Sequence, residues 1–87
     1  MFNNKFKIKI HGRAGLTYKE GKKSVSIDSE MLFSEYNMVI YTNSIKSWNP
    51  PFDNEMLTEE NKKRIISNIK KDFEKTGIKV DWEGLNT

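Results

Sequence analysis

A helix with a clear signal at each end constrains the fold of this chain more than any other segment. Thr58 is a favourable N-cap residue, and Glu59 and Glu60 place negative charge in the first turn. Gly77 stands where a residue with left-handed backbone ends a helix. Between these signals the apolar residues recur at helical spacing and form one stripe, made of Ile65, Ile66, Ile69 and Phe73. This helix therefore needs one apolar surface to cover.

Opposite charges four residues apart are expected to support the solvent side of the helix. Glu59 precedes Lys63, and Glu60 precedes Arg64, each in the order that favours a side-chain pair. Positive charge gathers towards the last turns, where it complements the helix dipole, in Lys70, Lys71 and Lys75.

Short segments outside the helix alternate in the way that is typical of strands with one solvated face. Residues 5–10 alternate lysine with Phe or Ile, and residues 78–83 alternate apolar with charged side chains. Residues 16–19 and 24–27 flank a turn sequence in which Gly21 can adopt a positive φ. This arrangement predicts a strand near each end of the chain and a β-hairpin around Gly21.

The middle of the chain completes the predicted sheet. The apolar run 38–42 predicts a central strand buried on both faces. Residues 29–36 are ambiguous: in one interpretation Ser29 caps a short helical turn, and Met31, Leu32 and Phe33 touch the core. We therefore predict an α+β fold, with a mostly antiparallel sheet of about five strands and one long helix, in the C-terminal half, packed on one face. The order of the strands stays open.

Length and composition favour one small domain. The 87 residues leave room for a single core, so we expect residues 1–87 to form one domain. The chain contains no cysteine, which excludes disulfides, cysteine-based zinc sites and thiol chemistry. No run approaches the roughly 20 apolar residues of a membrane span, and no signal-peptide pattern follows the first residues. We expect a cytoplasmic protein that does not contact a membrane.

Enzyme chemistry finds little support in the residues. His11 is the only histidine, and it stands beside a glycine-rich loop, where a solvated side chain is a simpler interpretation than a catalytic base. The run 12–15 lacks the ending of a phosphate-binding loop. No group of His, Asp or Glu has the spacing of a metal site. We expect no catalytic residue, no metal and no cofactor.

Residues 44–51 form the most distinctive segment, a stiff elbow between a strand and the helix. Pro50 and Pro51 restrict the backbone, and stiff loops that carry aromatic residues suit recognition, because little entropy is lost on binding. We predict a partner-binding surface here and at adjacent strand ends, made of Glu30, Tyr41, Lys46, Trp48, Asn49, Pro50, Pro51 and Phe52. Trp48 and Phe52 are the expected apolar anchors. The alternative, which we weigh more heavily for Trp48, is that the ring caps the hydrophobic core.

Positive charge near the N-terminus opens a second possibility, a nucleic-acid-binding protein. The net charge is +3, but residues 1–23 hold seven basic residues against Glu20 alone. Such a stripe can follow a phosphate backbone, with Tyr18 available to stack on a base. The candidate residues are Lys5, Lys7, Lys9, Arg13, Lys19, Lys22 and Lys23. The simpler alternative is that lysines on an outer strand keep that edge from pairing with other chains.

The order of these features resembles a family of small bacterial immunity proteins of polymorphic toxin systems, immunity protein 74. The most distinctive shared element is the run Trp48-Asn49-Pro50-Pro51. The likeness also covers residues 15–20, 27–32, 39–41, 44–47, 65–69 and 77–80. The resemblance implies a cytoplasmic, non-enzymatic protein that binds a cognate toxin and blocks its activity. It maps no binding surface onto this chain. The slight positive charge fits an acidic toxin surface, or a binding mode other than mimicry of phosphates, better than mimicry of nucleic acid.

Overall fold

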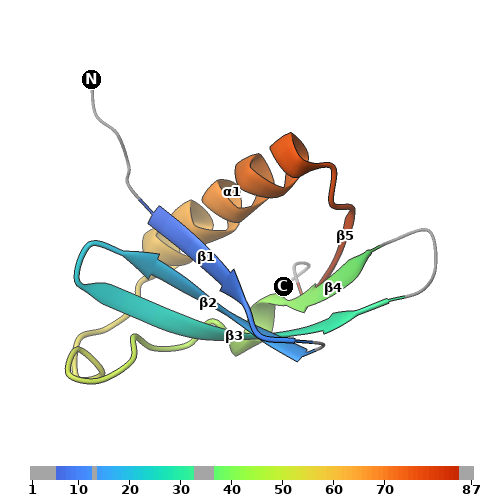
Figure 1. Cartoon of the computed structure of the whole chain (residues 1–87). Helices are drawn as coiled ribbons and strands as arrows, with labels where there is room; N and C mark the ends of the chain where they lie inside the picture. Colours follow the sequence, from blue (N-terminus) through green and yellow to red (C-terminus); the bar gives the residue numbers. More distant parts are fainter. Residues whose placement is uncertain (1–5, 13, 33–36, 85–87) are drawn as a thin grey trace.

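The computed structural model describes residues 6–12, 14–32 and 37–84, which form a sheet crossed by one long helix (Figure 1). The strands are β1 (Phe6–Ile10), β2 (Ala14–Glu20), β3 (Lys23–Met31), β4 (Met38–Tyr41) and β5 (Val80–Glu83). A short 3-10 turn η1 (Thr42–Ser44) follows β4, and helix α1 (Glu59–Thr76) precedes β5. The predicted α+β class, with five strands and one long helix, is confirmed.

The strands lie in the order β1-β2-β3-β4-β5, which the sequence left open. Neighbours from β1 to β4 pair antiparallel, whereas β5 pairs with β4 in parallel. The parallel pair is possible because α1 returns the chain from one end of the sheet to the other between these two strands. β5 therefore lies at one edge of the sheet and β1 at the other.

The hairpin between β2 and β3 turns at Gly21 and Lys22, and Gly21 has the predicted positive φ, of +62°. β3 then continues to Met31, so Ser29 lies inside a strand and the interpretation of a helix cap at Ser29 is wrong. Ser29 pairs with Ile40 of β4, and this pairing between strands forms in place of a local turn. Met31 is 42% exposed rather than part of the core, and Phe33 lies outside the described residues.

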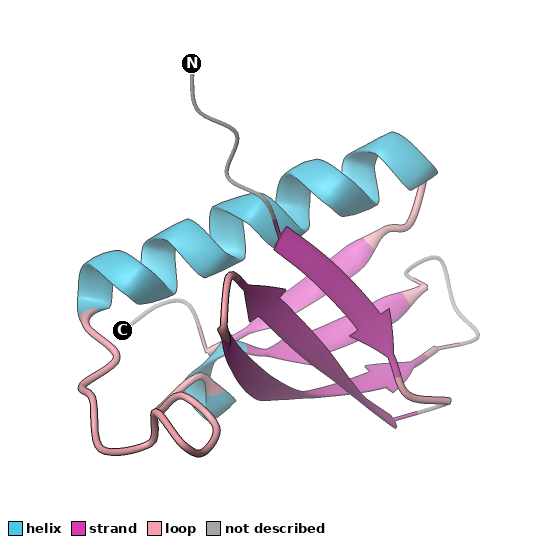
Figure 2. Cartoon of the chain, turned by 60° about the vertical axis from the view of Figure 1, so that its left-hand side comes forward, coloured by secondary structure: helices cyan, strands magenta, loops and turns pink. Residues whose placement is uncertain are grey.

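The core lies between α1 and the face of the sheet that α1 crosses (Figure 2). The predicted stripe of α1 is buried there, in Ile65, Ile66, Ile69 and Phe73. The sheet contributes fully buried side chains from three strands, namely Leu16, Tyr18, Val25, Ile27, Met38 and Ile40. Val39, on the other face of β4, is also buried, as predicted for a central strand. The opposite face of the sheet carries mainly polar residues.

Both helix ends follow the sequence signals. The Thr58 hydroxyl accepts a hydrogen bond from the Asn61 N–H at 3.1 Å, and the Asn61 side chain accepts one from the Thr58 N–H at 3.1 Å. Gly77 ends the helix with a φ of +79°. The predicted pairing of Arg64 with Glu60 is not what the structure contains, because Arg64 reaches across to β2 instead.

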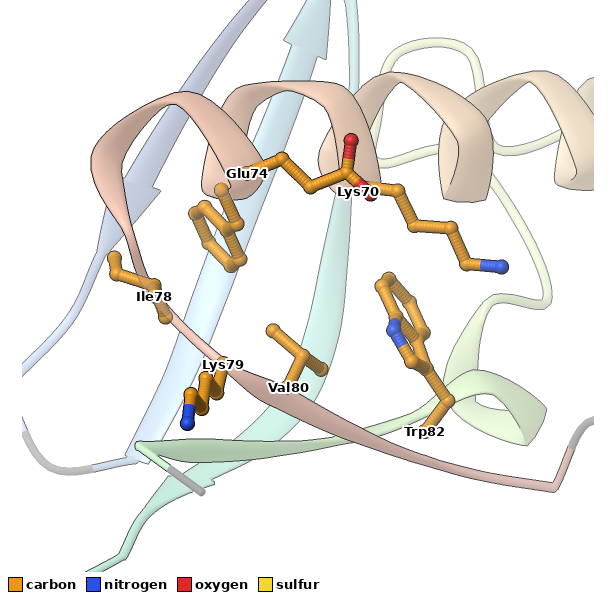
Figure 3. A pocket seen from close by; sticks show the side chains of 7 residues that line it. Lys70, Glu74, Ile78, Lys79, Val80 and Trp82 are labelled. Atoms are coloured by element: carbon orange, nitrogen blue, oxygen red, sulfur yellow. The ribbon is translucent and has the colours of Figure 1, made fainter. Parts of the chain in front are cut away.

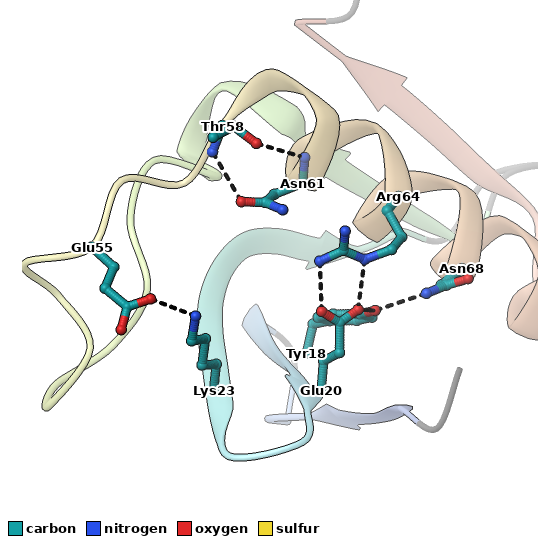
Figure 4. A network of polar contacts seen from close by, with 8 residues as sticks. All are labelled: Tyr18, Glu20, Lys23, Glu55, Thr58, Asn61, Arg64 and Asn68. Atoms are coloured by element: carbon teal, nitrogen blue, oxygen red, sulfur yellow. Dashed lines mark hydrogen bonds and ion pairs between the residues drawn. The ribbon is translucent and has the colours of Figure 1, made fainter. Parts of the chain in front are cut away.

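A polar network fastens α1 to the end of β2 (Figure 4). Arg64 donates to both carboxylate oxygens of Glu20, at 3.0 and 2.7 Å, and the Tyr18 hydroxyl donates to Glu20 at 2.7 Å. Asn68, which is 4% exposed, donates to the Tyr18 hydroxyl at 2.8 Å. Burial, with this carboxylate close by, raises the pKa of Tyr18 to about 12, and the Arg64 guanidinium lowers the pKa of Glu20.

Candidate partner-binding site

The predicted elbow 44–51 continues in the structure to residue 57. This whole segment, called the elbow from here on, covers the part of the edge of β3 that β4 leaves unpaired. β4 pairs only with the last part of β3, from Ser29 to Met31. Further along the same edge, the Ser44 hydroxyl accepts a hydrogen bond from the Asp28 N–H at 2.8 Å. The Asn49 N–H donates to the Ser24 carbonyl, also at 2.8 Å. The elbow thus satisfies backbone groups of β3 in place of a strand.

The Asn49 side chain adds to this attachment. Its amide donates to the Ser24 hydroxyl at 3.0 Å and to the Ser26 hydroxyl at 3.2 Å. The Asn49 carbonyl accepts from the Phe52 N–H at 3.0 Å across the turn that contains the cis Pro50–Pro51 bond. Asn49, predicted as a partner contact, therefore holds the elbow on the sheet.

Trp48 is 3% exposed and belongs to the hydrophobic core, as does Ile45. The prediction that Trp48 presents an apolar surface to a partner thus needs correction, and the alternative that the ring caps the core describes it. The physical reason is that the elbow turns Ile45 and Trp48 inward, where they complete the layer between the sheet and α1. Phe52 is half-buried and packs against the same core.

Lys23 closes the elbow from the side of the hairpin. Its ammonium lies 5.6 Å from the ring centres of both Trp48 and Phe52, and it forms an ion pair with Glu55. Figure 4 shows this pair beside the turn of the hairpin. Lys23 was a candidate for nucleic-acid binding, but these contacts engage its charge within the molecule.

The outer surface of the elbow faces solvent. Lys46, Pro50 and Pro51 are exposed, and Met56 is 81% exposed. Met56 lies opposite Ser47 in an isolated β-bridge, which closes the elbow on itself. Sequence reasoning missed Met56; its signal was a large apolar residue directly after the polar run 53–55 and before the N-cap residue Thr58. The elbow therefore has a fastened inner side and an open outer side.

Glu30 and Tyr41 belong to a different surface, the face of the sheet opposite α1. The Tyr41 hydroxyl donates to the Glu30 carboxylate at 3.2 Å, and both residues line a shallow hollow with Gly15 and Asp28. Loss of solvent and this hydrogen bond raise the pKa of Tyr41. The eight predicted contact residues thus divide between the elbow and this face.

The candidate residues for nucleic-acid binding do not all lie on one surface. Lys7 lies opposite Lys19 in the β1–β2 ladder, and Lys9 follows on the same face, all three exposed. Lys22 is exposed in the hairpin turn, whereas Lys5 and Arg13 lie outside the described residues. The same face becomes acidic towards β5, through Asp28, Glu30, Asp81 and Glu83. Its charge is therefore separated, with a positive half and a negative half.

His11 is exposed, and its Nε2 lies 2.6 Å from the Thr17 hydroxyl. Within residues 6–12, 14–32 and 37–84, no group of His, Cys, Asp or Glu can hold a metal ion. No helix of this part of the chain has the length and apolar character needed to cross a membrane.

The described residues thus form a small α+β fold whose elbow is fixed on its inner side and exposed on its outer side. The chain belongs to the immunity protein 74 family, whose model matches residues 7–83. No curated protein and no solved structure matches the chain significantly. Family membership indicates an immunity protein, and it implies a toxin as partner in general terms.

Proposed function

We propose that this chain binds a cognate bacterial toxin in the cytoplasm and neutralises it by covering the active region of the toxin, without catalysis or a cofactor. The observation that carries this proposal is the elbow, which is fixed on its inner side by core burial and hydrogen bonds and open on its outer side. Membership of the immunity protein 74 family supports the same function.

The attachment of the elbow supports its use as a contact surface. Asn49 and Lys23 fasten it at two points, so few of its degrees of freedom remain to be lost on binding. Met56 offers an exposed apolar contact, and Lys46 offers a positive charge for an acidic toxin surface. Pro50 and Pro51 add rigid apolar surface between the fastened ends.

Co-expression tests the proposal. The protein products of the genes next to that of this chain are expressed in bacteria one at a time. A product that stops growth is taken as the candidate toxin and is then expressed together with the wild-type or a variant chain while growth is measured. We expect the wild type to restore growth and Met56→Asp to restore it poorly. Met31→Asp is the matched control, because Met31 is also an exposed methionine but lies at the end of β3. Growth inhibition that persists with the wild-type chain contradicts the proposal.

The lysines of β1 and β2 support a second candidate function, nucleic-acid binding. Lys7 and Lys19 are cross-strand neighbours, and Lys9 extends the row. If this row binds phosphates, the affinity for nucleic acid should fall steeply as the salt concentration rises. The triple change Lys7→Glu, Lys9→Glu, Lys19→Glu should abolish nucleic-acid binding. Reversal of Lys62 and Lys63 on α1 is the control. Binding that both sets of changes reduce equally argues against a specific row.

A further inference from the structure

Among the described residues, no further strand pairs with the outer backbone edge of β5. In the part of the chain that the structure describes, β5 pairs with β4 alone. The Lys79 carbonyl accepts hydrogen bonds from the N–H groups of Asn37 and Met38, and the Lys79 N–H donates to the Asn37 side chain. Because backbone groups alternate in direction along a strand, the N–H and C=O groups of Val80 and Trp82 point away from β4. They offer a further strand two donors and two acceptors.

An apolar groove runs beside this edge, between β5 and the second half of α1 (Figure 3). Its apolar lining consists of Phe73, Ile78, Val80 and Trp82. The last three side chains are only half-buried, so part of the groove surface remains open to solvent. Lys70, Lys79 and Glu74 complete the lining, and the Lys70 ammonium lies 5.6 Å from the Trp82 ring centre. The charged rim is therefore positive overall.

We propose that the outer edge of β5 receives an extended segment of the cognate toxin, which adds to the sheet as a further strand. Every second side chain of such a segment would point into the groove, so we expect apolar residues at alternate positions. Because the rim carries two lysines and one carboxylate, we also expect an acidic side chain in the part of the toxin segment that lies beside the rim. The inference rests on the proposed function and adds the chemical class of the toxin segment.

A second copy of this chain fits the same edge less well. Two-fold antiparallel pairing of β5 with itself would place both α1 helices on the same side of the joined sheet. The rims of the two grooves, each positive overall, would then lie on the same side of the joined sheet, and like charges repel. The positive rim is better matched by an acidic segment of another protein.

Amide hydrogen exchange, followed residue by residue by NMR, tests the edge directly, with an inactivated form of the neighbouring gene product that stops growth as probe. In the free chain the amides of Val80 and Trp82 should exchange fast, whereas the Asp81 amide faces β4 and should be protected. In the complex we expect exchange at Val80 and Trp82 to slow by about tenfold or more. Asp81 should change little and serves as the internal reference.

A pair of substitutions at Val80 separates the backbone contact from the side chain. Val80→Pro removes the outward N–H and leaves the pairing with β4, because proline is tolerated on an edge strand where its nitrogen faces outward. Val80→Ala shortens the side chain and keeps the N–H. We expect Val80→Pro to bind the toxin about five to tenfold more weakly than Val80→Ala. Thermal unfolding identifies a variant that fails to fold. In that case the exchange experiment on the wild type decides whether a toxin segment pairs with β5.

Two adjacent lysines of α1 test the charge of the rim. Lys70 lines the groove, whereas Lys71 lines a separate hollow with Phe6 on another side of the helix. Lys70→Glu should weaken toxin binding several-fold, and Lys71→Glu should leave it close to the wild-type value. Equal effects of the two changes would overturn the role of the rim.

The outcomes distinguish this inference from the proposed function. If the wild-type chain binds the toxin but exchange at Val80 and Trp82 is unchanged and Val80→Pro binds like Val80→Ala, the inference is overturned and the proposed function stands. If the wild-type chain does not bind the toxin, both fall. Protection of the same two amides without toxin, increasing with protein concentration, would make a second copy the occupant and would also overturn the inference.

Discussion

Two strands of the same sheet differ in what lies beside their unpaired edges. Where β4 stops pairing with β3, the elbow takes over and satisfies the backbone of β3 with Ser44 and Asn49. In the described part of the chain, the outer edge of β5 is bordered instead by a partly open apolar groove. An exposed edge is a template for pairing with another chain. This protein thus covers the stretch of β3 that β4 leaves unpaired with its own loop, whereas within the described residues the outer edge of β5 has no strand beside it.

The largest expected effect on the free energy of unfolding concerns the two tryptophans, Trp48 in the elbow beside β3 and Trp82 in β5. Trp48 is 3% exposed beneath the elbow, whereas Trp82 is half-buried in the groove. Trp48→Ala should lower the free energy of unfolding by about 3–5 kcal/mol, which is a large part of the stability of a small domain. Trp82→Ala should cost about 1–2 kcal/mol. Thermal and urea unfolding measure both, and equal losses would contradict the comparison.

Removing the amide of Asn49 tests the fastening of the elbow. Asn49→Ala deletes the side-chain hydrogen bonds to Ser24 and Ser26 and should cost about 1–2 kcal/mol of stability. It should also speed amide exchange within the elbow, while exchange in β5 stays the same. Asn54→Ala is the control, since Asn54 is exposed in the same loop. A change of similar size in the control would show that the fastening lies elsewhere.

Acid should loosen the end of the molecule that carries the elbow. The hydrogen bonds from Arg64 hold the pKa of Glu20 below its usual value. The ionised carboxylate therefore stabilises the fold above the ordinary pKa of glutamate, about 4.3, and this contribution is lost as pH falls through the lowered value. The stability difference between the wild type and Glu20→Gln should accordingly shrink on acidification. Urea unfolding over a pH series measures it, and a difference independent of pH would contradict this assignment.

The smallest expected effect on the free energy of unfolding is that of replacing Lys23, which contacts the elbow from the β2–β3 hairpin. Lys23→Ala removes the contacts with the rings of Trp48 and Phe52 and the ion pair with Glu55, and should cost about 0.5–1 kcal/mol. Its neighbour Lys22 is exposed in the turn, so Lys22→Ala should leave the stability unchanged. Urea unfolding of the two variants side by side gives the comparison, and high salt should narrow the difference.

The sequence predicted elements whose signals are local. Helix α1 follows from the cap at Thr58, the apolar stripe and Gly77, all within one segment. The hairpin follows from alternation around Gly21. The candidate site was predicted less well: the elbow was recognised as stiff, but Trp48 and Asn49 turned out to face the sheet. Stiffness is a property of the segment, whereas the side on which a ring lies depends on what packs against it.

Neighbours far apart in the chain account for what the sequence did not reveal. Arg64 had a suitable partner four residues away in Glu60, yet it pairs with Glu20 of β2, which only the docking of α1 brings near. The parallel position of β5 beside β4 likewise depends on where α1 returns the chain. The sequence accounts for the class of fold, the helix and the hairpin, because backbone preferences and apolar periodicity act within short segments. The tertiary structure selects the strand order, the buried face of the elbow and the open edge of β5, because these depend on contacts between distant segments.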